Sequence, residues 1–191
     1  MRDLSLHLMD VVRNSVDAGA GKIEIHIEAD IQEDILKITV KDNGRGMEDS
    51  TIKKVTDPFY TTRTTRKVGL GIPLFVETCR RSQGDLTIKS ELGKGTEITA
   101  VMKISSIDRP PIGDIGNTVA GLQASETEID YVVGFKCGDK DFTYSTEEVR
   151  QVLGNEVSLD NPQVIGWIEE SITEGLENIF GGVLNEIPCR T

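Results

Sequence analysis

Apolar and polar residues alternate with two different periods along the first half of the chain. Over residues 4–18, apolar side chains recur at spacings of three and four, which predicts an amphipathic helix. Residues 22–29 and 35–41 alternate with a period of two, and each stretch predicts a strand with one buried face. The acid-rich turn between them predicts that the two strands form an antiparallel pair.

A second set of elements follows with the same kinds of pattern. A short helix is expected over 48–55, and after a loop rich in Thr and Arg the motif GLGIP opens a helix that Gly84 ends. Two further strands are predicted over 85–91 and 96–104, joined by LGKG as a hairpin turn. The predicted order is helix, two strands, short helix, loop, helix and two strands.

The motif RPP at 109–111 marks a change in the chain. Two prolines disfavour both a helix and a central strand, so the motif predicts a boundary between residues 1–106 and residues 112–191. Beyond it, the pattern predicts a hairpin over 129–144 and a helix over 162–179 that begins with Asn-Pro. The second part is therefore expected to be a small α+β region.

Charge is distributed unevenly between the two parts. The net charge is −11, and residues 1–104 contain 16 acids and 16 bases, whereas residues 105–191 contain 16 acids and 5 bases. An acidic C-terminal region disfavours nucleic acid and favours a protein partner with a basic or mixed surface. We find no catalytic constellation in it.

Cysteine spacing and hydropathy indicate the compartment. Cys79, Cys137 and Cys189 lack the CxxC and Cys-His spacings of metal sites, which indicates reduced thiols. No apolar run approaches the ~18 residues that indicate a membrane span, and the N-terminus lacks a long apolar core. We expect a cytoplasmic protein with no membrane partner.

The first predicted helix carries a second stripe, which is polar. His7, Asp10, Asn14 and Asp17 follow one another at spacings of three and four, and Asp10 lies one turn before Asn14. Two functional groups would therefore point in the same direction.

Three further motifs lie at the ends of predicted elements. DNGRGM (42–47) follows a strand, GLGIP (69–73) opens a helix, and GKGTE (93–97) joins two strands. Together with Asn14, and in this order, they resemble the motifs of the GHKL ATPases, which include gyrase, the heat-shock chaperone, histidine kinases and mismatch-repair MutL proteins. The resemblance covers about residues 1–104.

The resemblance draws on two branches of that family. DVVRNSVDAGA resembles the N box of MutL-type proteins, whereas DPFYTTRTTRKVGLGIPL resembles the F and G2 boxes of histidine kinases. It implies an α/β (α+β) two-layer sandwich, with a mixed, largely antiparallel sheet and helices on one face. It also implies ATP and Mg²⁺ as ligands.

An adenine site is implied where the second strand ends. Asp42 would accept a hydrogen bond from the adenine amino group, which discriminates against guanine because guanine has a carbonyl there. Gly44 and Gly46 would permit close backbone approach, and Thr96 would support the site through its hydroxyl. The full set implied to contact nucleotide is Asn14, Asp17, Asp42, Gly44, Gly46, Met47, Phe59, Thr61, Thr62, Arg66, Lys67, Val68, Gly69, Leu70, Gly71, Ile72 and Thr96.

The phosphate end is implied by the same resemblance. The Asn14 side-chain carbonyl would be the Mg²⁺ ligand, because this ion prefers oxygen donors shared with phosphate. Backbone amides of Gly69 and Gly71 at a helix start would face the phosphates. Arg66 and Lys67 would fold over them as a lid.

Two positions depart from the family pattern. Asp10 takes the place of the Glu that MutL and gyrase relatives use as general base, and its side chain is one methylene shorter, so hydrolysis is expected to be slow. Asp17 stands where histidine kinases often have Lys. The lid bases would have to replace that cation.

The use of ATP leaves three alternatives open. The first is a cytosolic ATP-binding regulatory protein whose nucleotide state controls association with a partner. The second is a protein kinase acting in trans on His or Ser/Thr, and the third is a slow MutL-like ATPase. Neither His7, within the predicted ATP domain, nor His26, on the polar side of a strand, has the setting of a phosphoacceptor.

The partner is suggested by a fainter resemblance in the C-terminal part. RPPIGDIG, EIDYVVGF and TEEVRQVLG are similar to stretches of stand-alone ATP-binding proteins associated with electron-bifurcating iron hydrogenases. This implies a hydrogenase-type redox complex as partner, with a signalling protein as the alternative. The chain lacks a cysteine cluster for iron-sulfur ligation, so its role would be regulation.

The boundary at 109–111 gives two views of domain organisation. In the first, a fragment ending near Ser106 folds and binds ATP, and residues 112–191 serve only a partner. In the second, the apolar face of the helix over 162–179 packs on the ATP domain and completes its core.

Overall fold

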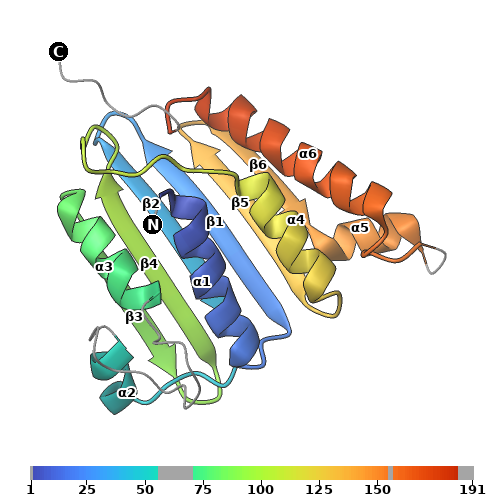
Figure 1. Ribbon diagram of the computed structural model, residues 1–191, viewed down its shortest axis with the longest axis horizontal. Helices are drawn as coiled ribbons and strands as arrows, with labels where there is room; N and C mark the ends of the chain where they lie inside the picture. The colour runs from blue at the N-terminus through green and yellow to red at the C-terminus, as the bar shows by residue number, and fades with distance from the viewer. Residues whose placement is uncertain (1, 56–70, 155–156, 185–191) are drawn as a thin grey trace.

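The computed structural model describes residues 2–55, 71–154 and 157–184, within which it has six helices and six strands (Figure 1). The helices are α1 (Leu4–Asp17), α2 (Asp49–Val55), α3 (Gly71–Arg81), α4 (Ile115–Ser125), α5 (Thr146–Leu153) and α6 (Pro162–Phe180). The strands are β1 (Lys22–Asp30), β2 (Ile35–Asp42), β3 (Asp85–Glu91), β4 (Gly95–Lys103), β5 (Asp130–Cys137) and β6 (Lys140–Ser145).

All six strands belong to one sheet, in the order β3-β4-β2-β1-β5-β6. Every neighbouring pair is antiparallel except β1 with β5, which run parallel. The predicted hairpins are present as β1–β2, β3–β4 and β5–β6. The prediction of a mixed, largely antiparallel sheet is confirmed.

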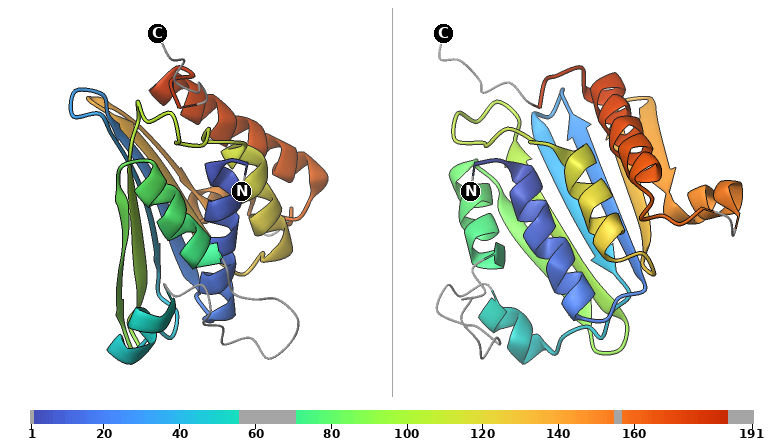
Figure 2. Two further views of the ribbon diagram at one scale, coloured as in Figure 1. Left: turned by 60° about the vertical axis from the view of Figure 1, so that its left-hand side comes forward. Right: turned by 45° about the vertical axis from the view of Figure 1, so that its right-hand side comes forward.

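The helices α1, α3, α4 and α6 cover one face of this sheet (Figure 2). Because side chains alternate along a strand, β1 turns Ile23, Ile25 and Ile27 toward the helices, and all three are fully buried. The opposite face of β1 carries Glu24 and His26, and the His26 side chain is 39% exposed. The prediction of two layers with helices on one face is confirmed.

Helix α4 was not predicted from the sequence. Its composition is poor in strong helix formers and includes two glycines, which disfavour a helix in isolation. Gly116 is nevertheless required by packing, since a Cβ there would lie 2.2 Å from Thr173 Oγ1 and 2.6 Å from the Glu169 carbonyl oxygen of α6. Tertiary contact with α6, and the buried side chains Val119 and Leu122, therefore stabilise α4.

Helix α6 is the longest of the described helices, at 19 residues, and has the predicted start. The Asn161 side chain accepts from the Gln163 N–H at 2.9 Å, and Pro162 occupies the first turn, where its missing donor has no cost. Within the described ranges, no helix is both long enough and apolar enough to span a membrane.

The C-terminal part shares the core of the N-terminal part. β5 pairs with β1 over eight residues, with Ile23 opposite Tyr131 and Ile27 opposite Phe135, and both aromatic side chains are buried. The Leu4 N–H donates to the Pro111 carbonyl at 2.9 Å, which joins the start of α1 to the segment before α4. The shared sheet joins the two parts through β5, whereas α6, the helix named in the second view of domain organisation, packs mainly on α4, β5 and β6.

Arg109, within the predicted boundary segment, is buried rather than exposed in a hinge. It is only 2% exposed, and it donates to the carbonyl oxygens of Ile104 (2.8 Å), Pro110 (3.1 Å) and Leu184 (3.0 Å). Burial lowers the pKa of the guanidinium from its ordinary value. These bonds fasten the segment that follows β4 to the segment that follows α6.

A fragment of residues 1–106 is therefore expected to lose cooperative unfolding. The truncation would uncover one edge of β1 and the side of α1 that contacts α4, and a domain is stabilised by only ~5–15 kcal/mol in total, so the loss of this burial should be enough to unfold the fragment. Circular dichroism during thermal melting checks this. A matched fragment of residues 1–184 keeps every described element and should melt like the full chain, whereas a cooperative transition in 1–106 would contradict the expectation.

Candidate nucleotide-binding site

Asp42 is the last residue of β2, and three donors hold its carboxylate. Ser15 Oγ donates to Oδ2 at 2.7 Å, and the backbone N–H groups of Gly44 and Thr96 donate to Oδ1 at 2.9 and 3.3 Å. Asp42 is only 8% exposed, so an unpaired carboxylate would be costly at this position. Donors from α1, from the turn after β2 and from β4 therefore fix the carboxylate in one orientation.

Ser15 contacts the Asp42 carboxylate, although the helical pattern of residues 4–18 did not single it out as a candidate site residue. It is buried among the residues that pack on the sheet, and its hydroxyl points at Asp42. The signal in the sequence was a polar residue in line with Leu4, Leu8, Val11 and Val12. Such a residue needs a hydrogen-bond partner once buried.

Two glycines of DNGRGM have steric reasons for their identity. A Cβ on Gly44 would lie 2.9 Å from the Cβ of Ala18 and 3.1 Å from Asp42 Oδ1. Gly46 has φ +66°, and a Cβ there would lie 2.0 Å from the Glu91 carbonyl oxygen. The first glycine keeps the turn close to the Asp42 carboxylate, and the second allows it to pass under the β3–β4 hairpin.

A serine that the sequence did not single out ties this turn to the hairpin. Ser90 Oγ receives a hydrogen bond from the Met47 N–H (2.8 Å), donates to the Gly95 carbonyl (2.9 Å) and lies 2.9 Å from Thr96 Oγ1. Thr96 thus contacts Asp42 through its backbone N–H, whereas its hydroxyl lies against Ser90, and the predicted role of that hydroxyl in adenine binding stays a prediction. Thr96 pairs with Asp42 across the sheet, and the Met47 bond to Ser90, which is the Thr96 partner on β3, places Met47 at the same end.

Asp10 lies against the first residue of α3. A Cβ added to Gly71 would be 2.9 Å from the Asp10 Cβ and 3.1 Å from its Oδ2. Glycine therefore lets the start of α3, whose first amides have no partners within the helix, approach the acidic side chain of α1. Ile72, the next predicted contact, is buried, with 9% exposure.

Asn14 and Asp17 extend the polar stripe of α1 beyond Asp10. Both are exposed, as a residue that contacts a ligand must be before the ligand binds. Among the described residues no group of three or more His, Cys, Asp or Glu side chains is arranged to hold a metal ion. A Mg²⁺ ion here would need phosphate oxygens and water to complete its octahedral coordination, which is its usual mode of binding with nucleotides.

Eight predicted contact residues lie outside the described part of the chain. They are Phe59, Thr61, Thr62, Arg66, Lys67, Val68, Gly69 and Leu70. The predicted lid and the roles of the first two residues of GLGIP therefore stay predictions.

His7 belongs to the packing between α1 and α3. Its ring stacks on Phe75 with centroids 4.7 Å apart, and Nε2 is 3.0 Å from Thr78 Oγ1. Among the described residues Nδ1 has no hydrogen-bond partner. Burial lowers the pKa of His7 to about 4, so the ring is neutral at physiological pH.

Residues 2–106 match the family model of histidine kinase-, DNA gyrase B-, and HSP90-like ATPases. Because the match covers more than half of the chain, this protein belongs to that family. The predicted GHKL resemblance is thereby confirmed. ATP binding is the property that this ATPase domain implies.

Two curated relatives show where the similarity lies. A sensor protein of Shewanella frigidimarina is 32% identical over 103 residues, which are 53% of this chain and 16% of the relative. Sporulation kinase E of Bacillus subtilis is 34% identical over 90 residues, which are 46% of this chain and 12% of the relative. The matches thus cover less than a fifth of the length of these relatives.

A solved structure extends the fold comparison. The N-terminal domain of a DNA repair protein aligns with a TM-score of 0.55 at 18% identity and covers 75% of this chain and 52% of that chain. Residues 1–106 are only about 55% of the 191 residues, so the alignment includes part of the C-terminal region. This likeness concerns the fold.

The neutral state of buried His7 predicts acid sensitivity. Its pKa is about 4 in the folded chain against 6.5 ordinarily, so the unfolded chain binds more protons between these values. The free energy of unfolding should decrease by on the order of 2–3 kcal/mol as pH falls through that window. Urea denaturation at several pH values measures this.

Two histidine variants separate the effect of His7 from that of the other histidine. His7→Gln should flatten the pH dependence between pH 6.5 and 4, whereas His26→Gln, at the other histidine of the chain, should retain it. If the free energy of unfolding changes equally with pH in the wild type and in His7→Gln, the burial of His7 has no such effect.

Proposed function

We propose that this chain binds ATP with Mg²⁺ at the Asp42 end of the sheet, and that its nucleotide state controls how the acidic C-terminal region associates with a partner protein. The proposed setting is the cytoplasm. The reduced state of buried Cys79, a thiol whose pKa burial raises to about 12, suits that compartment.

The Asp42 carboxylate carries the proposal. A carboxylate oxygen can accept two hydrogen bonds, and Oδ1 already accepts from Gly44 and Thr96. Within the part of the chain that the structure describes, Oδ2 accepts only from Ser15, so it retains capacity for one more donor. The adenine amino group would supply that donor, whereas the guanine carbonyl would oppose a fixed carboxylate.

The polar stripe of α1 supports a phosphate end beside the adenine site. Ser15 faces Asp42, and Asn14, the preceding residue, is exposed on the same helix. Its amide oxygen would be a neutral ligand for Mg²⁺, which supplies positive charge to the phosphates when bound. Gly71 brings the amide end of α3 to Asp10, so α3 would offer backbone donors to phosphate oxygens.

Asp10 favours slow hydrolysis as a second candidate function. Its carboxylate lies beside the start of α3, where the terminal phosphate would be bound, and it would orient water as a general base. The shorter side chain places that base farther from the phosphate than Glu would. Release of inorganic phosphate by the isolated chain, lost in Asp10→Asn, would support hydrolysis over sensing alone.

The names of the relatives favour phosphoryl transfer as a further candidate. Sporulation kinase E and the sensor protein kinase FleS of Pseudomonas aeruginosa both share the matched segment. A kinase acting in trans would transfer radiolabel from ATP to a protein in a cell extract. ATP consumption without label transfer would favour the other two functions.

Asp42→Asn should weaken ATP binding by about 10- to 150-fold, the range of a lost hydrogen bond to a charged group of about 1.5–3 kcal/mol. The amide keeps the size of the side chain, and its NH₂ can donate to Ser15, so the fold should persist. Preference for ATP over GTP should shrink in the same measurement by calorimetry.

A matched control lies at the other end of the same strand. Asp34 precedes β2, has φ +57°, which Asn tolerates, and bonds to Ser105. Asp34→Asn removes the same charge and should leave ATP affinity unchanged. Unaltered ATP affinity in a folded Asp42→Asn variant would remove Asp42 from the site.

Asn14→Ala should reduce the binding of ADP in the presence of Mg²⁺ more than it reduces the binding of adenosine. Only the phosphate end would lose a metal ligand, because adenosine has no phosphate. Titrations of both ligands with and without Mg²⁺ measure the difference. Asn117→Ala removes an exposed amide from α4 as the control, and equal losses for ADP and adenosine in Asn14→Ala would mean a structural role.

A further inference from the structure

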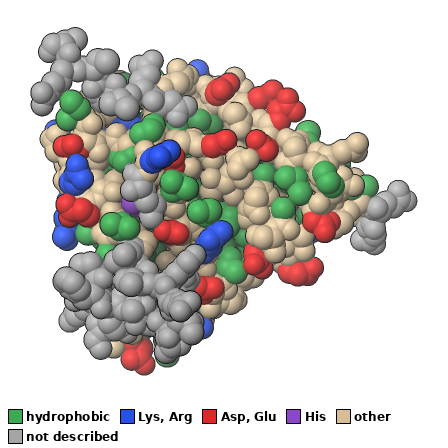
Figure 3. All heavy atoms as spheres, viewed as in Figure 1, with side chains coloured by type: hydrophobic (Ala, Val, Ile, Leu, Met, Phe, Trp, Pro, Cys, Tyr) green, Lys and Arg blue, Asp and Glu red, His purple; other side chains and the backbone are tan. Residues whose placement is uncertain are grey.

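A groove of about 470 Å³ lies between β6, α5 and α6, on the C-terminal part of the chain. Val149 and Val152 of α5 and Val164 and Trp167 of α6 form its apolar walls. Val152 is 86% exposed and Trp167 is 53% exposed, although both are large hydrophobic residues. Figure 3 shows hydrophobic side chains gathered at this end of the molecule.

The groove follows the outer edge of β6. Four consecutive residues, Phe142 to Ser145, line it. Side chains of a strand alternate between faces, so a groove on one face would be lined by every second residue only. β6 is the last strand of the sheet, and in the described ranges its backbone pairs with β5 alone. Its outer edge is available to a further strand.

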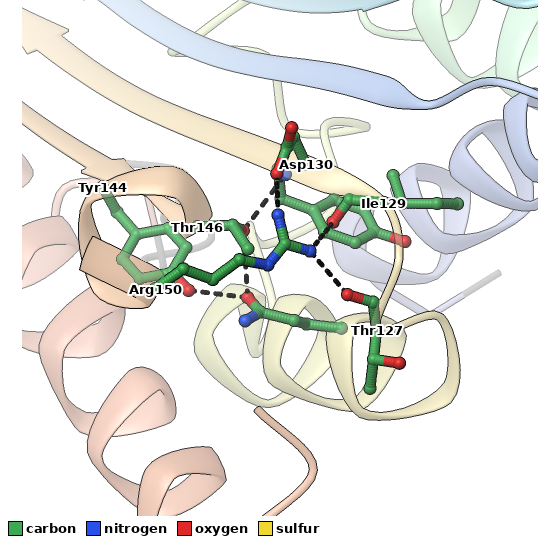
Figure 4. Close-up of polar contacts among 8 residues, drawn as sticks. Thr127, Ile129, Asp130, Tyr144, Thr146 and Arg150 are labelled. Atoms are coloured by element: carbon green, nitrogen blue, oxygen red, sulfur yellow. Dashed lines mark hydrogen bonds and ion pairs between the residues drawn. The ribbon is translucent and has the colours of Figure 1, made fainter. Parts of the chain in front are cut away.

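The walls of the groove are held in place from the inside. Arg150 of α5 forms an ion pair with Asp130 and donates to the Thr127 carbonyl, which anchors α5 to the start of β5 (Figure 4). Behind β6, the Tyr144 hydroxyl donates to Gln123 of α4 at 2.6 Å. Gly175 of α6 lies so close to Phe142 that a Cβ would be 2.8 Å from its ring. The groove is therefore a preformed surface.

Charge indicates what the groove accepts. Residues 141–184 contain nine acids and one base, and that base, Arg150, is engaged with Asp130. Glu148 lines the groove, and Glu170 and Glu174 follow Trp167 on α6 at spacings of three and seven, which places them on the same side of the helix. Figure 3 shows acidic side chains beside the hydrophobic ones. A second copy of this chain would bring like charges together, whereas a basic segment would be attracted.

We propose that this groove binds an extended segment of a partner protein, which adds as a strand to the edge of β6, inserts an apolar side chain beside Trp167 and carries Lys or Arg at its flanks. Backbone hydrogen bonds to the edge and alternate side chains in an adjoining apolar groove are a known mode of peptide recognition. The inference rests on the proposed function for its regulatory meaning, while the binding surface lies outside the family-matched residues 2–106.

The test uses a display library of random 12-residue peptides, selected on the full-length chain without nucleotide. Enriched peptides should have apolar residues at alternate positions and carry Lys or Arg. Higher salt should weaken their binding several-fold. Trp167 is the only tryptophan of the chain, so a peptide beside it should shift the fluorescence emission to shorter wavelength. A selection that enriches no such peptide would overturn the proposal.

Two variants locate the binding. Trp167→Glu should weaken the selected peptide at least tenfold, measured by polarisation of a labelled peptide. Ile31→Glu alters another exposed hydrophobic residue, 55% exposed, in the β1–β2 turn and should leave affinity unchanged. Equal affinity in wild type and Trp167→Glu would overturn the proposal, as would sedimentation showing instead a dimer that Trp167→Glu dissociates.

N-methylation of the peptide tests the strand pairing. In an added strand only every second amide faces β6, so methylating one alternate set should abolish binding and methylating the other should preserve it. Equal effects of the two sets would exclude strand addition. In the absence of nucleotide, Asp42→Asn should bind the peptide with wild-type affinity. The proposal for the groove can therefore be rejected separately from the proposal for the ATP site.

Discussion

The double pairing of β1 is the constraint on which the rest of the structure depends. β1 forms eight residue pairs with β2 and eight with β5, so both of its edges are used, and its isoleucines are buried under the helices. The family-matched part of the chain supplies one partner and the C-terminal part supplies the other. Without β5, β1 would expose apolar side chains and a row of backbone donors and acceptors. The acidic C-terminal region is therefore needed to complete the sheet, in addition to providing a surface for a partner.

At the end of the neighbouring strand, burial of one carboxylate organises the candidate site. Asp42 can be taken out of water because Ser15, Gly44 and Thr96 donate to it, and these donors come from three separate elements. The same requirement positions α1 relative to β2 and β4. Since α1 also carries Asp10 and Asn14, the bond that orients the predicted adenine acceptor also fixes the place of the predicted phosphate end.

The local pattern of the sequence predicted most elements of the fold, because period-two and helical spacing report which faces are buried. The sheet order, by contrast, depends on contacts between distant segments, and the pairing of β5 with β1 had no local signal. Helix α4 had an indirect one. β4 and β5 run in the same direction within one sheet, and such strands need a crossover connection, usually a helix. The sequence does not give the sheet order, so this requirement for a connecting helix could not be inferred from it.

The candidate site was predicted where a motif requires a special backbone, and missed where a common residue acquires its role through burial. Gly44 and Gly46 have identities that only close approach and positive φ explain. Ser15 and Ser90 are ordinary serines in an alternating or helical pattern, and only the three-dimensional structure shows what they bind. Arg109 is a similar case. It precedes two prolines in the sequence, and nothing in that setting indicates that its guanidinium is buried.

The arrangement of helices supplies a physical route between the candidate nucleotide site and the groove. α1 packs on α4, and α4 packs on α6 so closely that Gly116 admits no side chain against Thr173. A close-packed interior transmits displacement rather than absorbing it, so a shift of α1 would move α4 and then the helix that carries Trp167. A ligand alters such an arrangement only by its difference in affinity for the two positions of α1. If the proposed ATP binding shifts α1 in this way, the coupling must be reciprocal, and a segment bound beside Trp167 would change ATP affinity by the same factor by which ATP changes the affinity for the segment.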